Sequence, residues 1–306
     1  MLQILKNTRI DFVGLRYWGY GFSLITFVIS VVLLSLGYLK PGVDFAGGHL
    51  VQVRALNAGI GIGQVRAALS TAGIADAEVQ TYGSRDEFLI RVPLSEEAGA
   101  SKGAGVEQAL TAAFPGAHEV VRTEDVGPKI GAELSRNAVR AVLWSLALIL
   151  LYVSWRFELR FAVGAVVSLA HDVTICLGFL ALTGRQTSLS VVAALLTIVG
   201  YSLNDTIVVC DRIREELRLR RREPLPVIIN SSINLTLSRT FITGLSAIVV
   251  LIVLSLFGGK VINDFAVTLL FGTILGTYSS IFIASPVVLE WDRLTSRFRK
   301  AKRAEG

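Results

Sequence analysis

Residues 17–39, with the sequence YWGYGFSLITFVISVVLLSLGYL, contain no charged side chain and decide the class of fold. A helix of this length, at a rise of ~1.5 Å per residue, crosses the ~30 Å of hydrocarbon in a bilayer. The stretch is longer than the ~7–15 apolar residues of a secretory signal, and no small-residue cleavage motif follows it. It therefore predicts a first transmembrane helix that is not cleaved.

The remaining chain repeats this apolar pattern. Of the 306 residues, 52% are hydrophobic and only 18% are charged, so most of the surface faces something other than water. The same values exclude a disordered chain. Five further apolar stretches predict an α-helical polytopic membrane protein with six transmembrane helices. These five lie within residues 137–289, at about residues 138–155, 161–183, 188–209, 239–257 and 265–289.

The basic residues predict the orientation of the spans. They concentrate in residues 1–16, in the segment 210–239 and in the tail 290–306, which six crossings place on one side of the membrane. Positive loops stay in the cytoplasm, so both termini are expected there. The basic run at residues 218–222 is interpreted as an anchor near anionic lipid, with docking to a cytoplasmic partner as the alternative. Neither interpretation involves nucleic acid.

Residues 40–136 follow the periodicities of a soluble domain and carry nine basic and twelve acidic residues, so we expect them to be periplasmic. Alternating apolar and polar residues predict strands, and spacings of three and four predict helices. The resulting order βαββαβ is that of a small α+β, ferredoxin-like domain between the first and second spans. The expected elements are residues 49–56, 64–71, 77–82, 87–92, 106–114 and 118–125.

No feature of the sequence indicates an enzyme. The domain has no nucleophile–base pair, and its glycines at 59, 61 and 63 lack the rest of a dinucleotide-binding motif. Two cysteines in apolar stretches and three scattered histidines predict no disulfide framework, metal site or cofactor.

Carboxylates inside the membrane are the first functional candidates, because each costs ~2.5–3.5 kcal/mol near the bilayer centre. Asp264 lies at the outer end of the sixth span and can reach water. Asp172, next to His171, lies ~15–17 Å from the cytoplasmic start of its span, close to the midplane. Asp205 lies ~6–9 Å inside the cytoplasmic end of the fourth span. The last two positions predict intramembrane sites.

Asp205 has a polar setting that continues on the fifth span. Arg239 sits at the cytoplasmic start of that span, in the same layer as Asp205. Their pairing favours the ionised carboxylate and their separation favours the protonated form, which suits a proton relay. A static ion pair between two helices remains the alternative. The supporting polar residues are Tyr201, Ser202, Asn204 and Thr206 on the fourth span, and Asn234 and Thr240 at the fifth.

Two further features concern packing. Gly272, Gly276 and Ser280 are spaced by four on the sixth span and predict a face against which another helix packs closely. His171 is interpreted either as a packing residue bonded to a neighbouring helix or, with Asp172, as a secondary intramembrane site.

With these residues the chain resembles the SecD/SecF family of bacterial protein-export membrane proteins, on its SecF side, within the resistance-nodulation-division superfamily. The resemblance spans nearly the whole chain and rests on five segments in order. They are GVDFAGG at 42–48, AHD at 170–172, GYSLNDTIVVCDRIRE at 200–215, NSSINLTLSRT at 230–240 and GTYSSIFIASP at 276–286.

The resemblance implies a function that periodicity does not. SecF-like proteins pair with SecD-like subunits, associate with the SecYEG translocon and use the proton motive force to help move preproteins across the inner membrane. It also implies that Asp205 and Arg239 act in proton passage, and that a separate SecD-like chain supplies the second half of the superfamily's twelve-helix arrangement. The expected partners are thus this subunit, the translocon, the translocating preprotein and membrane lipids.

Three other functions compete with this one. An intramembrane aspartyl protease would use Asp172 and Asp205 as a dyad, but their expected depths differ by ~6–10 Å and the Gly-x-Gly-Asp sequence is absent. A proton-coupled exporter of small molecules or lipids would need a larger exported domain with a cleft. An assembly factor of the translocon would move no protons, so Asp205→Asn would leave export unchanged.

Overall fold

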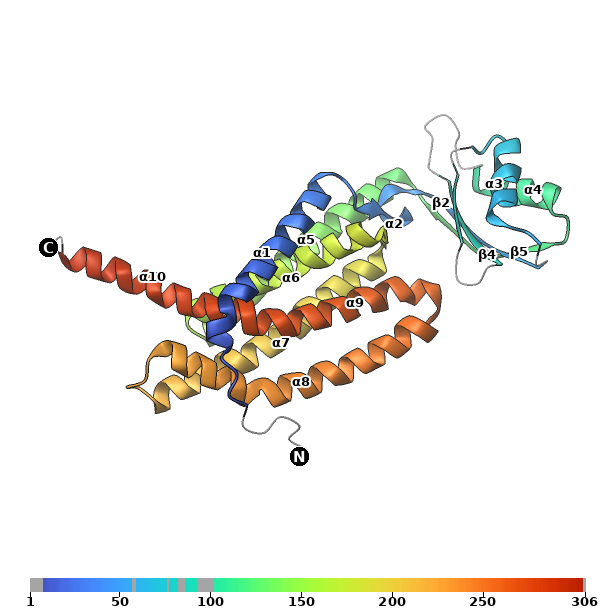
Figure 1. Ribbon diagram of the computed structural model, residues 1–306. Helices are drawn as coiled ribbons and strands as arrows, with labels where there is room; N and C mark the ends of the chain where they lie inside the picture. The colour runs from blue at the N-terminus through green and yellow to red at the C-terminus, as the bar shows by residue number, and fades with distance from the viewer. Residues whose placement is uncertain (1–7, 57–58, 76, 82–85, 93–101, 305–306) are drawn as a thin grey trace.

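Long helices lie side by side in the computed structural model, and a small α/β domain stands at one end of them (Figure 1). The structure describes residues 8–56, 59–75, 77–81, 86–92 and 102–304. Within these residues six helices are long and apolar enough to cross a membrane, as the sequence predicts. The long helices are α1 (Phe12–Ser35), α5 (Pro128–Arg156), α6 (Leu159–Thr183), α7 (Leu189–Leu219), α8 (Leu225–Phe257), and α9 (Gly259–Ser279), which leads into α10 (Ser285–Ala304).

Helix α6 lies at the centre of the bundle and packs against α1, α5, α7, α9 and α10. Two glycines allow neighbours to approach its backbone. A Cβ on Gly178 would overlap Ser30 of α1, and one on Gly164 would lie 2.9 Å from the carbonyl oxygen of Ala284. Helices α1, α5 and α8 instead expose rows of large apolar side chains, among them Trp18, Leu151 and Phe257. Such surfaces suit lipid or another apolar helix, not water.

Helices α7 and α8 extend well beyond the predicted spans. Helix α7 continues to Leu219 instead of ending near residue 209, and α8 begins at Leu225 instead of residue 239. The charged extension of α7 is low in hydropathy but carries ion pairs at helical spacing, from Arg212 and Arg220 to the buried Glu216. Ion pairs between residues four apart stabilise a helix, but hydropathy alone does not detect them, because it scores these residues only as polar. Arg239 therefore lies within α8, not at its start.

The last predicted span is interrupted by a π-helical turn, Ser280–Ala284, between α9 and α10. Pro286 follows it, and a proline has no N–H for the helical ladder and clashes with the preceding turn. The hydroxyl of Ser285 donates to the Ser280 carbonyl at 2.8 Å, which adds a hydrogen bond across the π turn. Single π turns within helices are often found at functional sites.

The small domain has a four-stranded sheet with strand order β3-β4-β2-β5, and all neighbouring strands are antiparallel. Helices α3 and α4 lie on the same side of the sheet (Figure 1). Buried valines, leucines and phenylalanine from both layers form its core, including Val53, Leu69, Phe88, Ile90 and Leu110. The elements are β2 (Gly48–Ala55), α3 (Ile62–Thr71), β3 (Glu78–Thr81), β4 (Glu87–Val92), α4 (Lys102–Ala113) and β5 (His118–Val126). Residue 82 of the predicted second strand lies outside the described residues.

A short collar connects this domain to the bundle. Strand β1 (Lys40–Pro41) pairs in parallel with β6 (Gln186–Thr187), which precedes α7, and helix α2 (Val43–Ala46) follows β1. The Gly42 N–H donates to the Thr187 carbonyl at 2.6 Å, and a Cβ on Gly131 of α5 would lie 2.8 Å from the Phe45 carbonyl oxygen. Asp44 accepts the N–H of Leu189, the first residue of α7, at 2.8 Å. The GVDFAGG segment thus fixes the base of the domain to the start of α7.

Asp44→Ala is expected to destabilise the chain by about 0.5–2 kcal/mol, because it removes an acceptor and a negative charge from the N-terminus of α7. Asp44→Asn keeps an acceptor oxygen and loses only the charge, so its loss should be smaller, about 0.3–1 kcal/mol. Reversible unfolding in mixed micelles measures both. Equal losses in the two variants would show that the hydrogen bond does not contribute.

Candidate functional site

Asp172 is the centre of a buried hydrogen-bonded cluster between three helices. It lies in the middle of α6 and its side chain is 1% exposed. One carboxylate oxygen accepts from the hydroxyls of Ser202 on α7 and Ser279 on α9, both at 2.7 Å. The other oxygen lies 3.0 Å from Nδ1 of the neighbouring His171. Three polar contacts on one carboxylate are a typical way to hold a charge away from water.

The small residues of α9 make this cluster possible. A Cβ on Gly276 would lie 2.9 Å from Cβ of Ser202, so the two helices meet at the serine that bonds Asp172. Gly272 meets Ile198 of α7 one turn away. Ser280 is buried, and its hydroxyl donates to the Thr277 carbonyl at 3.0 Å, where the π turn begins.

Asp205 lies one helical turn from Ser202 on α7 and is 3% exposed. Its Oδ2 is buried and, among the described residues, has no hydrogen-bond partner. The charge of Arg239 acts on Asp205, but no ion pair joins the two side chains. The buried hydroxyls of Thr206 and Thr240 also have no partner in the described part of the chain. The carboxyl of Asp205 is thus shielded from bulk water, and it lies near the positive charge of Arg239 without an ion pair to it.

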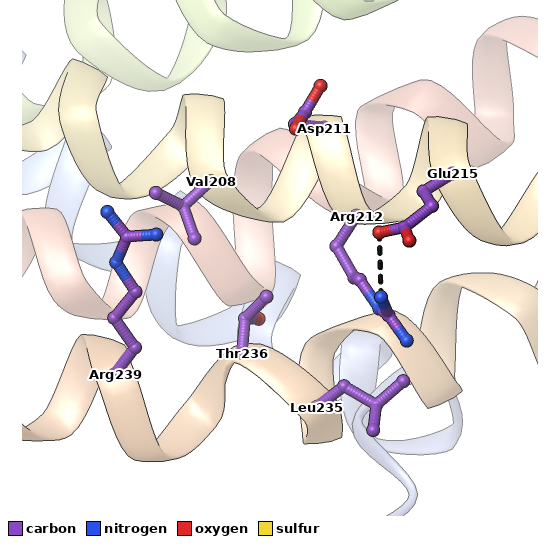
Figure 2. A pocket seen from close by; sticks show the side chains of 7 residues that line it. All are labelled: Val208, Asp211, Arg212, Glu215, Leu235, Thr236 and Arg239. Carbon is purple, nitrogen blue, oxygen red and sulfur yellow. Dashed lines mark hydrogen bonds and ion pairs between the residues drawn. The ribbon is translucent and has the colours of Figure 1, made fainter. Parts of the chain in front are cut away.

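Arg239 itself is exposed and lines an open cavity of about 370 Å³ between α7 and α8. Figure 2 shows its guanidinium reaching from α8 toward α7 beside Val208. Two acidic residues, Asp211 and Glu215, line the same cavity, and Arg212 donates to Glu215 at 2.7 Å. The cavity is therefore charged and open to solvent, and Val208, one of the residues that line it, lies three residues after Asp205 on α7.

The two aspartates lie in neighbouring layers of the bundle. Counting from the ends of the predicted spans separated Asp172 and Asp205 by ~6–10 Å along the membrane normal. Ser202, which bonds Asp172, is three residues from Asp205, so the rise between these layers is only ~4.5 Å. Helix α7 continues ten residues beyond the predicted end of its span at residue 209.

Two predicted supporting residues lie elsewhere. The Asn234 amide binds the N-terminal segment, accepting the Ile10 N–H at 3.0 Å and donating to the Ile10 carbonyl at 2.8 Å. Asn204 is exposed, whereas the neighbouring Asp205 is buried. The hydroxyl of Tyr201 lies near Gly244 of α8. The helical rotation of 100° per residue turns Asn204 away from Asp205, whereas Asn234 lies on α8 and contacts the N-terminal segment instead.

One member of the cluster, Ser279, had no assigned role in the sequence interpretation. It lies three residues after Gly276, on the face that meets α7, so the spacing of the small residues could have included it. Asp264 makes an ion pair with Arg185 at the end of the bundle that carries the small domain, and its side chain is 37% exposed. It therefore differs from Asp172 and Asp205, which are buried.

These features define a polytopic membrane protein with ionisable groups in the centre of its helical bundle. Residues 105–294 match the family model described as protein export membrane protein SecD/SecF, C-terminal. The chain is 48% identical to the protein translocase subunit SecF of Magnetococcus marinus, over 100% of this chain and 99% of that protein. It is 44% identical to the subunit of the same name from Desulfurispirillum indicum, over 94% and 93% of the two chains.

Solved structures agree with this relationship. The crystal structure of SecDF from Thermus thermophilus, described as a translocon-associated membrane protein, matches with a TM-score of 0.84 and 39% identity over 94% of this chain. SecDF in a super-membrane-facing form matches with a TM-score of 0.71 over 98% of this chain. The chain spans 39% and 40% of the length of these two proteins. The chain belongs to the SecF family of protein translocase subunits, and it is a multi-pass inner-membrane protein.

Proposed function

We propose that this chain uses the proton motive force to assist preprotein translocation, with Asp205 as the group that takes up and releases the proton. The observation that carries the proposal is the setting of Asp205. Its carboxyl is 3% exposed, has an unpartnered oxygen among the described residues and is influenced by Arg239 without an ion pair. A tightly paired aspartate would stay ionised, whereas this one is free to change its protonation state.

Arg239 is the group that makes proton binding depend on conformation. It lies on α8, which exposes most of its surface, and it lines the open cavity beside α7. A movement of α8 toward α7 would bring the guanidinium against Asp205 and expel the proton, and the reverse movement would favour uptake. A proton route from the aqueous phase is proposed to pass through this cavity, which Arg239 lines.

The chain is proposed to work with a SecD-like subunit. It covers about two fifths of the length of the SecDF chains that it matches. The apolar faces of α1, α5 and α8 are large and uncovered, which suits a second membrane subunit. Association with SecYEG and with the preprotein follows from the same family relationship.

The orientation and the small domain belong to the same proposal. Both termini are placed in the cytoplasm by the excess of Lys and Arg on their side, and residues 40–136 are placed in the periplasm. The domain is assigned as ferredoxin-like because its four-stranded antiparallel sheet has two helices on one face. Its other face is available to a translocating chain.

Reconstituted vesicles test this function. Vesicles that contain the translocon and the SecD-like subunit are prepared with and without this chain, and preprotein export is measured with and without a proton gradient. The chain should increase export only when the gradient is present. An equal increase without the gradient would favour an assembly factor, and gradient-driven efflux of small molecules without any effect on export would favour an exporter.

A further inference from the structure

His171 and Asp172 form an ionisable pair at the centre of α6 that the proposed function does not use. Asp172 is fully buried, and its contacts come from Ser202, Ser279 and His171. An ionised carboxylate only accepts hydrogen bonds, so this arrangement of two hydroxyls and one ring nitrogen suits the charged form. The His171 nitrogen that faces it, Nδ1, is then the one that carries the proton.

The second ring nitrogen of His171 is consequently the basic one. Nε2 is buried and has no hydrogen-bond partner among the described residues. The ring lies parallel to that of Phe27 on α1, with 6.4 Å between the ring centroids. A carboxylate bonded to Nδ1 fixes the tautomer of an imidazole and stabilises the imidazolium that forms when Nε2 takes a proton.

Ionisable neighbours of the pair lie on α6 and α7. Cys176 lies one turn after Asp172 on α6, and the charge of Asp172 acts on its thiol. Asp205 lies one turn after Ser202 on α7. No lysine or arginine makes an ion pair with Asp172 in the described part of the chain. An ionised Asp172 beside a neutral ring leaves a net negative charge inside the membrane. A proton on Nε2 turns the pair into a neutral imidazolium–carboxylate unit, which costs less to hold there.

We infer that His171 is a second proton-binding group of this chain, which accepts one proton on Nε2 while Asp172, held by Ser202 and Ser279, acts as its positioning residue. The step forms one N–H bond and consumes one H⁺, which comes from the aqueous phase. Its contribution to energy coupling rests on the proposed function, but the uptake of the proton does not. Ser202 places this second group one helical turn from Asp205.

Nitrogen NMR of the full chain in lipid nanodiscs tests the inference. The protein is labelled with ¹⁵N in its three histidines, His49, His118 and His171, and spectra are recorded from about pH 9 to about pH 5. His171→Asn identifies the signals of His171 by their loss. At high pH its Nδ1 should show the protonated shift and its Nε2 the unprotonated shift, and at low pH both should show the protonated shift.

His49 provides an internal comparison, because its Nδ1 also contacts a carboxylate, Asp125, in the small domain, and His49→Asn identifies its signals. In Asp172→Asn the signals of His171 should show a mixture of both tautomers, whereas those of His49 should not change. A protonated Nε2 at high pH, or an Nε2 that stays unprotonated at low pH, would overturn the inference. Because no export is measured, the result is independent of the gradient experiment.

Discussion

Asp205→Asn is expected to reduce preprotein export in the presence of a proton gradient to the level seen without one. Asparagine has nearly the same shape as aspartate but cannot take up and release a proton at this position. The side chain is almost fully buried and makes no ion pair, so the substitution breaks no observed contact. Assembly with the SecD-like subunit and the translocon should therefore be unchanged.

Asp264→Asn is the matched control for this experiment. Asp264 is also an aspartate on a membrane-spanning helix, but it lies at the end of the bundle, partly exposed and paired with Arg185. An exposed pair of this kind contributes only ~0–1 kcal/mol to stability. Asp264→Asn should retain the response to the gradient. If Asp205→Asn also retained it, while assembling normally, the chain would be an assembly factor that moves no protons.

Gly276→Leu is expected to destabilise the chain by about 2.5–6 kcal/mol. A Cβ at this position would lie 2.9 Å from the Cβ of Ser202 and 3.4 Å from its Cα, so α9 and α7 must move apart. Overpacking of this kind costs ~1–3 kcal/mol, and a lost hydrogen bond to the charged Asp172 adds ~1.5–3 kcal/mol. Reversible unfolding in mixed micelles measures the loss.

Gly200→Leu is the control substitution for Gly276. Gly200 also lies within a membrane-spanning helix, α7, but a Cβ there meets no other atom within 4 Å. The free energy of unfolding should change little, or increase by up to ~1 kcal/mol, because leucine favours a helix more than glycine does. A loss in Gly200→Leu as large as that in Gly276→Leu would show that the contact with Ser202 is not the cause.

The apolar spans could be predicted because length and hydropathy are local properties of the sequence. Residues 161–183 predict a span that the structure forms as α6, Leu159–Thr183. The strands of the small domain follow from alternation in the same way, and β4 begins and ends at the predicted residues. Helix ends in charged segments were not predictable from hydropathy, because ion pairs such as Arg212–Glu216 determine them.

The candidate site was predictable only in its ionisable residues. An aspartate within an apolar stretch is costly in a membrane, so it can be recognised from the sequence without knowledge of its depth. The sequence therefore indicates both Asp172 and Asp205. Which hydroxyls bond Asp172 depends on how three helices rotate against each other, so Ser279 could not be assigned from one helix alone. For the same reason the sequence assigns Asn234 to the surroundings of Asp205, whereas its amide forms a hydrogen bond with the backbone of Ile10.

Infrared spectroscopy of Asp205 itself is the most direct test of the proton-binding role. A protonated carboxyl gives a C=O stretching band that the carboxylate lacks, and spectra of the full chain in nanodiscs can be compared across pH. The other carboxyls of the chain also absorb in this region, so we expect one component of the band that decreases as the pH rises, is missing in Asp205→Asn and persists in Asp264→Asn. A band that remains unchanged in Asp205→Asn, or no band at any pH, would contradict proton binding at Asp205.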